Sequence, residues 1–108
     1  MTFYWELYII LMRVISKNEL IEFYKKHAET KSPLEAWYHE FKRENWSNPM
    51  DVINKYGSAR PIKENRVVFN IKGNKYRLVV KINYELKIIR IRFIGTHKEY
   101  DKINAEEI

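Results

Sequence analysis

Hydrophobic positions follow a helical period in the first half of the chain and alternate in the second half. The stretch "MRVIS" (12–16) has the β-branched alternation of a short strand. Ser16 then predicts the start of a helix, because Glu19 three residues later completes a capping box. After residue 65 the period changes from helical to alternating, which predicts strands. The pattern therefore predicts an α+β domain in which helices precede most of the sheet.

Two further helices are predicted by a polar cap that is followed by proline. Ser32 and Pro33 open the first of them, and Asn48 and Pro49 open a shorter one. The segment "GSARP" (57–61) is interpreted as the loop that ends this short helix. After Pro33, apolar residues recur at i, i+3, i+4 and i+7, which places one helix face on a core. These residues are Leu34, Trp37, Tyr38 and Phe41.

The second half predicts three antiparallel strands joined by hairpins, at 66–71, 75–84 and 88–94. With the strand at 12–16, this gives an antiparallel sheet of about four strands with two to three helices on one face. The face expected to pack on the helices is apolar: Val67, Phe69, Ile71, Tyr76, Leu78, Val80, Ile82, Ile89, Ile91 and Phe93. The opposite face is polar: Arg66, Asn70, Lys75, Arg77, Lys81, Arg90 and Arg92.

Six of the seven residues on that polar face are cationic and none is acidic. Like charges on adjacent strands repel one another, so a face that only contacts water usually mixes both signs. A phosphate backbone would relieve the repulsion. The whole chain also carries a net charge of +6, which favours an anionic partner and nucleic acid first. The alternative is a basic face that is merely solvated.

A polar cluster follows the last predicted strand. Thr96 and Glu99 predict a capping box for a short C-terminal helix. His97, Tyr100 and Asp101 would then share one side of that helix, at the end of the most basic strand. An imidazole and a phenol beside cations suit the transesterification of RNA, in which the 2′-OH attacks the adjacent phosphate. The pattern does not decide which group is the base and which the acid.

The alternative for this cluster is structural: His97 helps to cap the helix and Tyr100 packs its ring on the core. The other two histidines, His27 and His39, lie in helix patterns without convergent partners and are interpreted as surface residues. The chain contains no cysteine, which excludes disulfides, thiolate metal sites and a cysteine nucleophile and suits a cytosolic protein. No carboxylate cluster resembles a two-metal nuclease site.

Two motifs carry a family resemblance: F-N-x-x-G-N-x-x-R from Phe69 to Arg77, and G-T-H-x-E-Y-D from Gly95 to Asp101. Together they resemble the HigB-type toxins of bacterial toxin–antitoxin pairs, within the RelE-like superfamily. The resemblance runs from about Met12 to the C-terminus. It implies a RelE-like fold with helices on one face of an antiparallel sheet and RNA on the other.

The resemblance also implies an activity: ribosome-dependent endonucleolytic cleavage of mRNA in the A site, without metal or other cofactor. The implied partners are mRNA, the ribosome and a helix-turn-helix antitoxin of the HigA type. By position, the motifs assign His97 and Tyr100 to catalysis and Arg77 to phosphate stabilisation, and Lys75 is interpreted as a second cation or a base. The residues expected to bind RNA are Arg66, Asn70, Asn74, Lys81, Arg90, Arg92 and Lys98. The alternative function is a non-catalytic protein that blocks translation by occupying RNA or the ribosome.

The N-terminal stretch "MTFYWELYIIL" (1–11) lies outside the resemblance. It is apolar but shorter than the roughly 20 residues that a membrane span needs. It also lacks the basic region and cleavage site of a signal peptide. We therefore expect translation to start at Met12, residues 1–11 to be an upstream extension, and 12–108 to form the bacterial, cytoplasmic toxin domain.

Overall fold

The computed structural model describes residues 12–108. The expected start at Met12 concerns residues 1–11, which lie outside the described residues. Within the described range the elements occur in this order: β1 (Arg13–Ile15), α2 (Lys17–Lys26), the 3₁₀ turn η1 (Ala28–Thr30), α3 (Lys31–Phe41), α4 (Pro49–Lys55), β2 (Arg60–Ile62), β3 (Arg66–Ile71), β4 (Tyr76–Asn83), β5 (Ile88–Thr96) and α5 (His97–Tyr100). The predicted α+β order of elements is confirmed.

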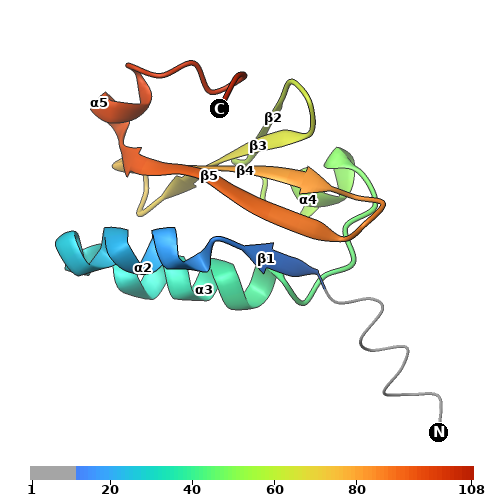
Figure 1. The fold of residues 1–108 in the computed structure, drawn as a ribbon, viewed down its shortest axis with the longest axis horizontal. Helices are drawn as coiled ribbons and strands as arrows, with labels where there is room; N and C mark the ends of the chain where they lie inside the picture. Colours follow the sequence, from blue (N-terminus) through green and yellow to red (C-terminus); the bar gives the residue numbers. More distant parts are fainter. Residues whose placement is uncertain (1–11) are drawn as a thin grey trace, which may run out of the picture.

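The sheet has five strands in the order β1-β5-β4-β3-β2. The pairs from β2 to β5 are antiparallel, whereas β1 is parallel to β5. Helices α2 and α3 lie on one side of the sheet, and α5 with the end of the chain lies on the other (Figure 1). No helix within residues 12–108 is long and apolar enough to cross a membrane.

The fifth strand is β2, which the sequence pattern did not reveal. Its Arg60 and Ile62 pair with Val68 and Arg66 of β3, so part of the segment interpreted as a loop is a strand. Proline is rare inside sheets, but Pro61 is tolerated here because β2 is an edge strand. The pairing carries Arg60 to the face of the sheet opposite α2 and α3.

The main core fills the space between the helices and one face of the sheet. Phe41 is fully buried, and its ring stacks between Trp37 and Trp46 with centroid distances of 5.0 and 4.7 Å. The indole N–H of Trp46 donates to the carbonyl oxygen of Phe41 at 2.9 Å. From the sheet, this core receives the apolar face that the alternation predicted, with the exception of Phe93. These stacked aromatic rings support the helix-facing side of the sheet through close packing.

Phe93 lies on the opposite face because β5 contains a β-bulge. Val79 pairs with Phe93 and Val80 pairs with Ile91, so Arg92 is the extra residue. Strand side chains alternate strictly, and one inserted residue reverses the faces of all residues that follow it. Ile94 therefore packs against the main core, and Phe93 joins a second apolar cluster. The prediction that Phe93 faces the helices is wrong for this reason.

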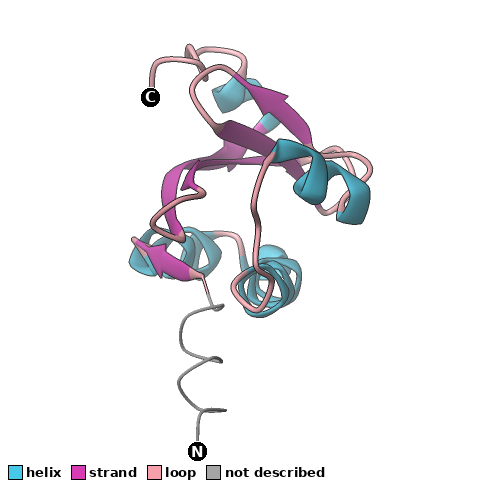
Figure 2. Cartoon of the chain, turned by 90° about the vertical axis from the view of Figure 1, so that its right-hand side faces the viewer, coloured by secondary structure: helices cyan, strands magenta, loops and turns pink. Residues whose placement is uncertain are grey.

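The second cluster forms where residues 101–108, here called the C-terminal strap, cross the other face of the sheet. Ala105 of the strap packs with Val68 and Val79, and partly buried apolar residues surround them: Ile62, Phe93, Tyr100 and Ile108. Arg66 fixes the strap by donating from Nε to the main-chain oxygen of Ile108 at 2.7 Å. Figure 2 shows the sheet between the strap side and helices α2 and α3. The centre of the polar face is therefore covered.

Two of the predicted helix starts need correction. Ser16 has a left-handed φ of 73° and makes no side-chain cap, so the expected capping box with Glu19 is absent. Ser32 lies inside α3, because η1 leads directly into that helix and Thr30 precedes its first residue. The third predicted start is confirmed: the Asn48 side chain accepts from the Asp51 N–H at 3.1 Å.

The two helical histidines differ. His39 is exposed, as expected, and lies 3.3 Å from Glu35. His27 is partly buried, since its ring stacks on Phe23 at 4.4 Å and meets the edge of Tyr76. The interpretation of His27 as a surface residue is thus wrong in part: its ring belongs to an aromatic cluster beneath the end of the sheet.

Candidate active site

One end of the polar face, outside the strap, holds a row of three residues on neighbouring strands. Asn70 of β3 pairs with Arg77 of β4, which pairs with Gly95 of β5. Helix α5 starts two residues after Gly95 and lies on the side of the sheet opposite α2 and α3 (Figure 1). A cavity of 360 Å³ lies at this corner, and it is lined by Ser58, Arg60, Val68, Asn70, Arg77, His97, Tyr100 and Asp101. Three of the four predicted catalytic residues therefore meet in one cavity.

Arg77 provides the positive charge of this cavity. Its side chain is mostly buried, with the residue only 8% exposed. Nη1 donates to the carbonyl oxygens of Asn74 and Tyr76, and Nη2 donates to the Asn74 side-chain oxygen at 2.8 Å. None of the ion pairs within residues 12–108 includes Arg77. The guanidinium is thus held in place by neutral oxygens, and its charge is left for an anionic ligand.

His97 is positioned from two sides. Its main-chain N–H donates to the Lys75 carbonyl oxygen at 3.0 Å, which ties α5 to the turn before β4. Its Nδ1 lies 3.1 Å from a carboxylate oxygen of Asp101, one helical turn later. A carboxylate at Nδ1 favours a proton on that nitrogen and leaves Nε2 for a substrate.

Tyr100 has features of both the structural role and the catalytic role that the sequence left open. Its ring packs against Phe93 with a centroid distance of 6.3 Å, as a structural role requires. Its oxygen lies at the cavity and accepts a hydrogen bond from Nη2 of Arg60 at 2.8 Å. Because the oxygen is the acceptor, the phenol O–H remains free to donate.

Arg60, Ser58 and Asp101 line the cavity but were not predicted as site residues. Arg60 and Ser58 belong to the segment interpreted as a loop. The only sequence signal for Arg60 was its alternation with Ile62 across Pro61, which is short and contains a proline. Asp101 was placed on the side of α5 that carries His97, and the spacing of four residues was the available signal.

The start of α5 has the predicted capping box. The Thr96 hydroxyl oxygen accepts from the Glu99 N–H at 3.1 Å, and the Glu99 carboxylate accepts from the Thr96 N–H at 2.8 Å. Just before it, a Cβ on Gly95 would lie 2.6 Å from the Phe93 ring and 3.0 Å from Glu99. A larger residue at this position would push the Phe93 ring and the Glu99 carboxylate of the capping box out of place.

The capping box predicts a pH-dependent stability. The hydrogen bond from the Thr96 N–H lowers the pKa of Glu99 below its ordinary value of 4.5. A carboxylate with a depressed pKa in the folded state stabilises the protein above its unfolded pKa, and this stability is lost as pH falls through the folded pKa. We expect the wild type to melt at a higher temperature than Glu99→Gln near neutral pH. The difference between the two melting temperatures should be constant there and should shrink below about pH 4.5.

Thermal unfolding of both proteins from about pH 3 to about pH 7 measures this difference. The other carboxylates titrate in both proteins, so their contributions cancel. A difference that does not change with pH would contradict the assignment of Glu99 to the cap.

The remaining predicted residues lie elsewhere. The Lys75 side chain is exposed and does not line the cavity, and Asn74 binds Arg77. Arg66 is only 5% exposed and holds the strap, while Lys98 is exposed on α5. The last three expected RNA contacts gather beyond the strap, at the far end of the sheet face: Lys81, Arg90 and Arg92. The cationic face is therefore divided into two parts.

Comparison with known proteins gives consistent matches. The model of the HigB toxin family, described as a RelE-like toxic component of a toxin–antitoxin system, matches residues 30–103. The chain is 28% identical over 96 residues to the mRNA interferase toxin HigB of Escherichia coli K12, covering 87% of this chain and 92% of that protein. It is 27% identical over 94 residues to the mRNA interferase HigB of Escherichia coli O6:H1, covering 85% and 91%. The family match extends over every candidate catalytic residue.

Proposed function

The chain belongs to the HigB family of RelE-like toxins, and from this premise we propose that it is a ribosome-dependent endonuclease that cleaves mRNA without a metal ion. Its relatives in Escherichia coli are named mRNA interferases. The observation that carries the proposal is the mostly buried Arg77, which has no carboxylate partner within residues 12–108 and lines one cavity with His97 and Tyr100.

The proposed reaction is an attack of the RNA 2′-oxygen on its own 3′-phosphate. A base removes the 2′-OH proton as the new O–P bond forms, and an acid donates a proton to the 5′-oxygen as the old P–O bond breaks. The products are a 2′,3′-cyclic phosphate and a free 5′-hydroxyl. Negative charge builds on the two non-bridging oxygens, so a fixed cation beside them lowers the barrier.

Each group in the cavity has a role in this scheme. Arg77 retains two N–H donors, on Nε and Nη2, with which it can bind phosphoryl oxygens. His97, through Nε2, and Tyr100, through its phenol oxygen, share the two proton transfers. One of them removes the 2′-OH proton and the other donates a proton to the leaving 5′-oxygen. Arg60 holds the Tyr100 oxygen and adds a second positive charge. Lys75, which lies outside the cavity, is proposed as a cation beside the bound RNA.

As the toxin component of a HigB-type toxin–antitoxin system, this chain has a cognate antitoxin and an mRNA target. We propose that the antitoxin is a helix-turn-helix protein of the HigA type and that the ribosomal A site presents the mRNA to the cavity. The setting is the bacterial cytoplasm, where both partners are found.

Primer extension on cellular mRNA after induction of the protein tests the proposed cleavage. We expect new 5′ ends inside codons within the translated region, together with growth arrest. Growth arrest without new 5′ ends would instead favour the alternative, in which the protein blocks translation by occupancy. The variant His97→Ala is the control, because it should remove the new ends if the cavity makes them.

A further inference from the structure

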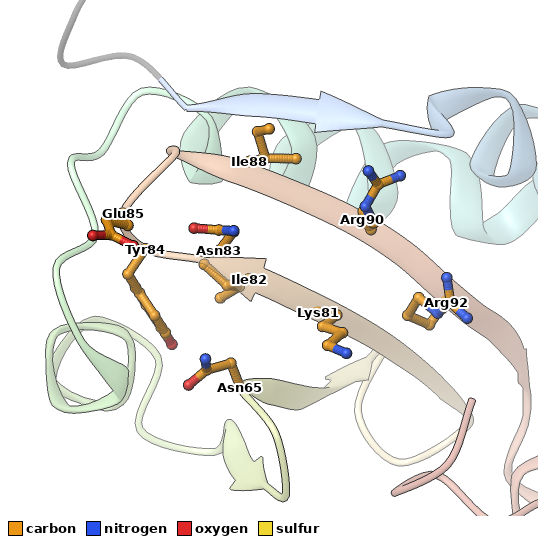
Figure 3. Close-up of a pocket in the computed structure, with 9 residues that line it drawn as sticks. All are labelled: Asn65, Lys81, Ile82, Asn83, Tyr84, Glu85, Ile88, Arg90 and Arg92. Atoms are coloured by element: carbon orange, nitrogen blue, oxygen red, sulfur yellow. The ribbon is translucent and has the colours of Figure 1, made fainter.

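A second polar hollow lies at the far end of the sheet face, where β4 and β5 approach their hairpin. Its volume is 600 Å³, larger than that of the candidate active site. Figure 3 shows Lys81 on β4 and Arg90 and Arg92 on β5 along its length, with Asn83 and Tyr84 towards the hairpin. This hollow, lined by these five residues among others, is here called the cationic recess.

The charges of the cationic recess are poorly neutralised. None of the ion pairs within residues 12–108 includes Arg90 or Arg92. Lys81 has only a long contact of 3.9 Å to the exposed Glu64, and Glu85 is the single carboxylate among the lining residues. Three cations around one concave surface repel each other, and a bound polyanion would remove that cost.

Strand alternation accounts for this arrangement. Arg90 stands in register with Lys81 on the adjacent strand, and Arg92 is the next side chain that alternation places on the same face of β5. The bulge falls at Arg92, so the change of face affects only the residues from Phe93 onward. The three cations of the recess therefore come from two paired strands and line one hollow.

The cationic recess and the candidate active site cannot bind the same phosphate. Arg77 and Lys81 are four residues apart on β4, which is about 13 Å at the usual rise of a strand. Between them lies the row that contains Val79 and Phe93, and Ala105 of the C-terminal strap packs on that row. The two sites share one face of the sheet but are separated by an apolar barrier.

We propose that the cationic recess binds the phosphodiester backbone of a stretch of RNA other than the one being cleaved. The choice of RNA rests on the proposed function, since both sites open on the same side of the sheet. The chemistry fits a backbone: three long cationic side chains follow adjacent strands, as phosphates follow one another along a chain. The backbone comes either from mRNA beyond the cleavage point or from ribosomal RNA.

The test compares two proteins from which three positive charges have been removed. The first carries Lys81→Gln, Arg90→Gln and Arg92→Gln. The matched control carries Lys25→Gln, Lys31→Gln and Arg43→Gln, at exposed positions on or after the helices of the other side. The probes are a single-stranded RNA of about 16 nucleotides with 2′-O-methyl groups, which cannot be cleaved, and ribosomes without mRNA.

We expect the recess variant to bind one of these probes at least about 10-fold more weakly than the control at about 150 mM salt. We also expect the slope of log Kd against log salt to become shallower by about 2, the value for three phosphate contacts to a single strand. Weaker binding to the methylated RNA assigns the recess to mRNA, and weaker binding to ribosomes assigns it to ribosomal RNA.

Equal affinities of the recess variant and the control for both probes, with equal salt slopes, would overturn the proposal. Thermal unfolding checks that both variants fold. Because neither probe is cut, the binding result stands whether or not the wild type cleaves RNA. Conversely, a wild type that cleaves mRNA while the recess variant binds like the control would reject the recess alone and leave the proposed function intact.

Discussion

Replacing His97 with alanine is expected to lower the rate of mRNA cleavage by about 10²- to 10⁴-fold, the usual contribution of a general acid or base. The side chain is the one imidazole in the cavity, and Asp101 holds its Nδ1 so that Nε2 is available. Alanine removes a proton-transfer group but leaves the capping box of α5 intact, since that box uses Thr96 and Glu99. The fold should therefore survive the substitution.

Single-turnover cleavage of ribosome-bound mRNA measures the effect on the chemical step, and relief of growth arrest on induction gives the cellular counterpart. The matched control is His39→Ala, which removes an exposed histidine that also has a carboxylate four residues away, but on α3. We expect His39→Ala to cleave at the wild-type rate. A folded His97→Ala variant with full toxicity would reject the assignment of His97 to catalysis.

Replacing Arg77 with alanine is expected to lower cleavage by about 10²- to 10³-fold, as measured when an enzyme loses one fixed donor to a developing negative charge. The guanidinium has no carboxylate partner within the described part of the chain, so its charge acts on whatever anion enters the cavity. Arg77→Lys should recover only part of the rate, because an ammonium group keeps the charge but loses the planar arrangement of donors.

The control for Arg77 must separate chemistry from folding, since its side chain also bonds to Asn74 in the turn before β4 and to Tyr76 at the start of β4. Thermal unfolding of Arg77→Ala and Arg77→Lys gives the structural effect. Single-turnover rates with folded protein give the chemical one. If Arg77→Ala folds and still cleaves at the wild-type rate, the proposed phosphate site is wrong.

Much of the fold was predictable because local signals and tertiary structure agree. Asn48 and Thr96 precede segments with strong cap patterns, and both make the expected caps. The convergence of Arg77 and His97 was also predictable, since Arg77 lies near the start of β4 and His97 directly follows the end of the adjacent strand β5. Antiparallel pairing alone brings these two strand ends together.

Three features could not be read from alternation. The bulge at Arg92 inserts a residue without any glycine or other local mark, so the faces after it were assigned in reverse. Strand β2 is three residues long and owes its pairing to β3 rather than to its own pattern. The C-terminal strap has few apolar residues, and Ala105 becomes buried only because Val68 and Val79 lie opposite. In each case a tertiary contact decides the structure.

The position of the strap and α5 in the chain has a consequence for the cell that makes the protein. The α5 residues that complete the active-site cavity follow all five strands, and the strap that covers the sheet beside it comes after them. Since synthesis runs from the N-terminus, a nascent chain that has reached β5 already has its cations but has neither His97 nor Tyr100 in place. The proposed cutting site is therefore assembled last, because the ribosome that makes the chain must first have passed all five strands and then Tyr100.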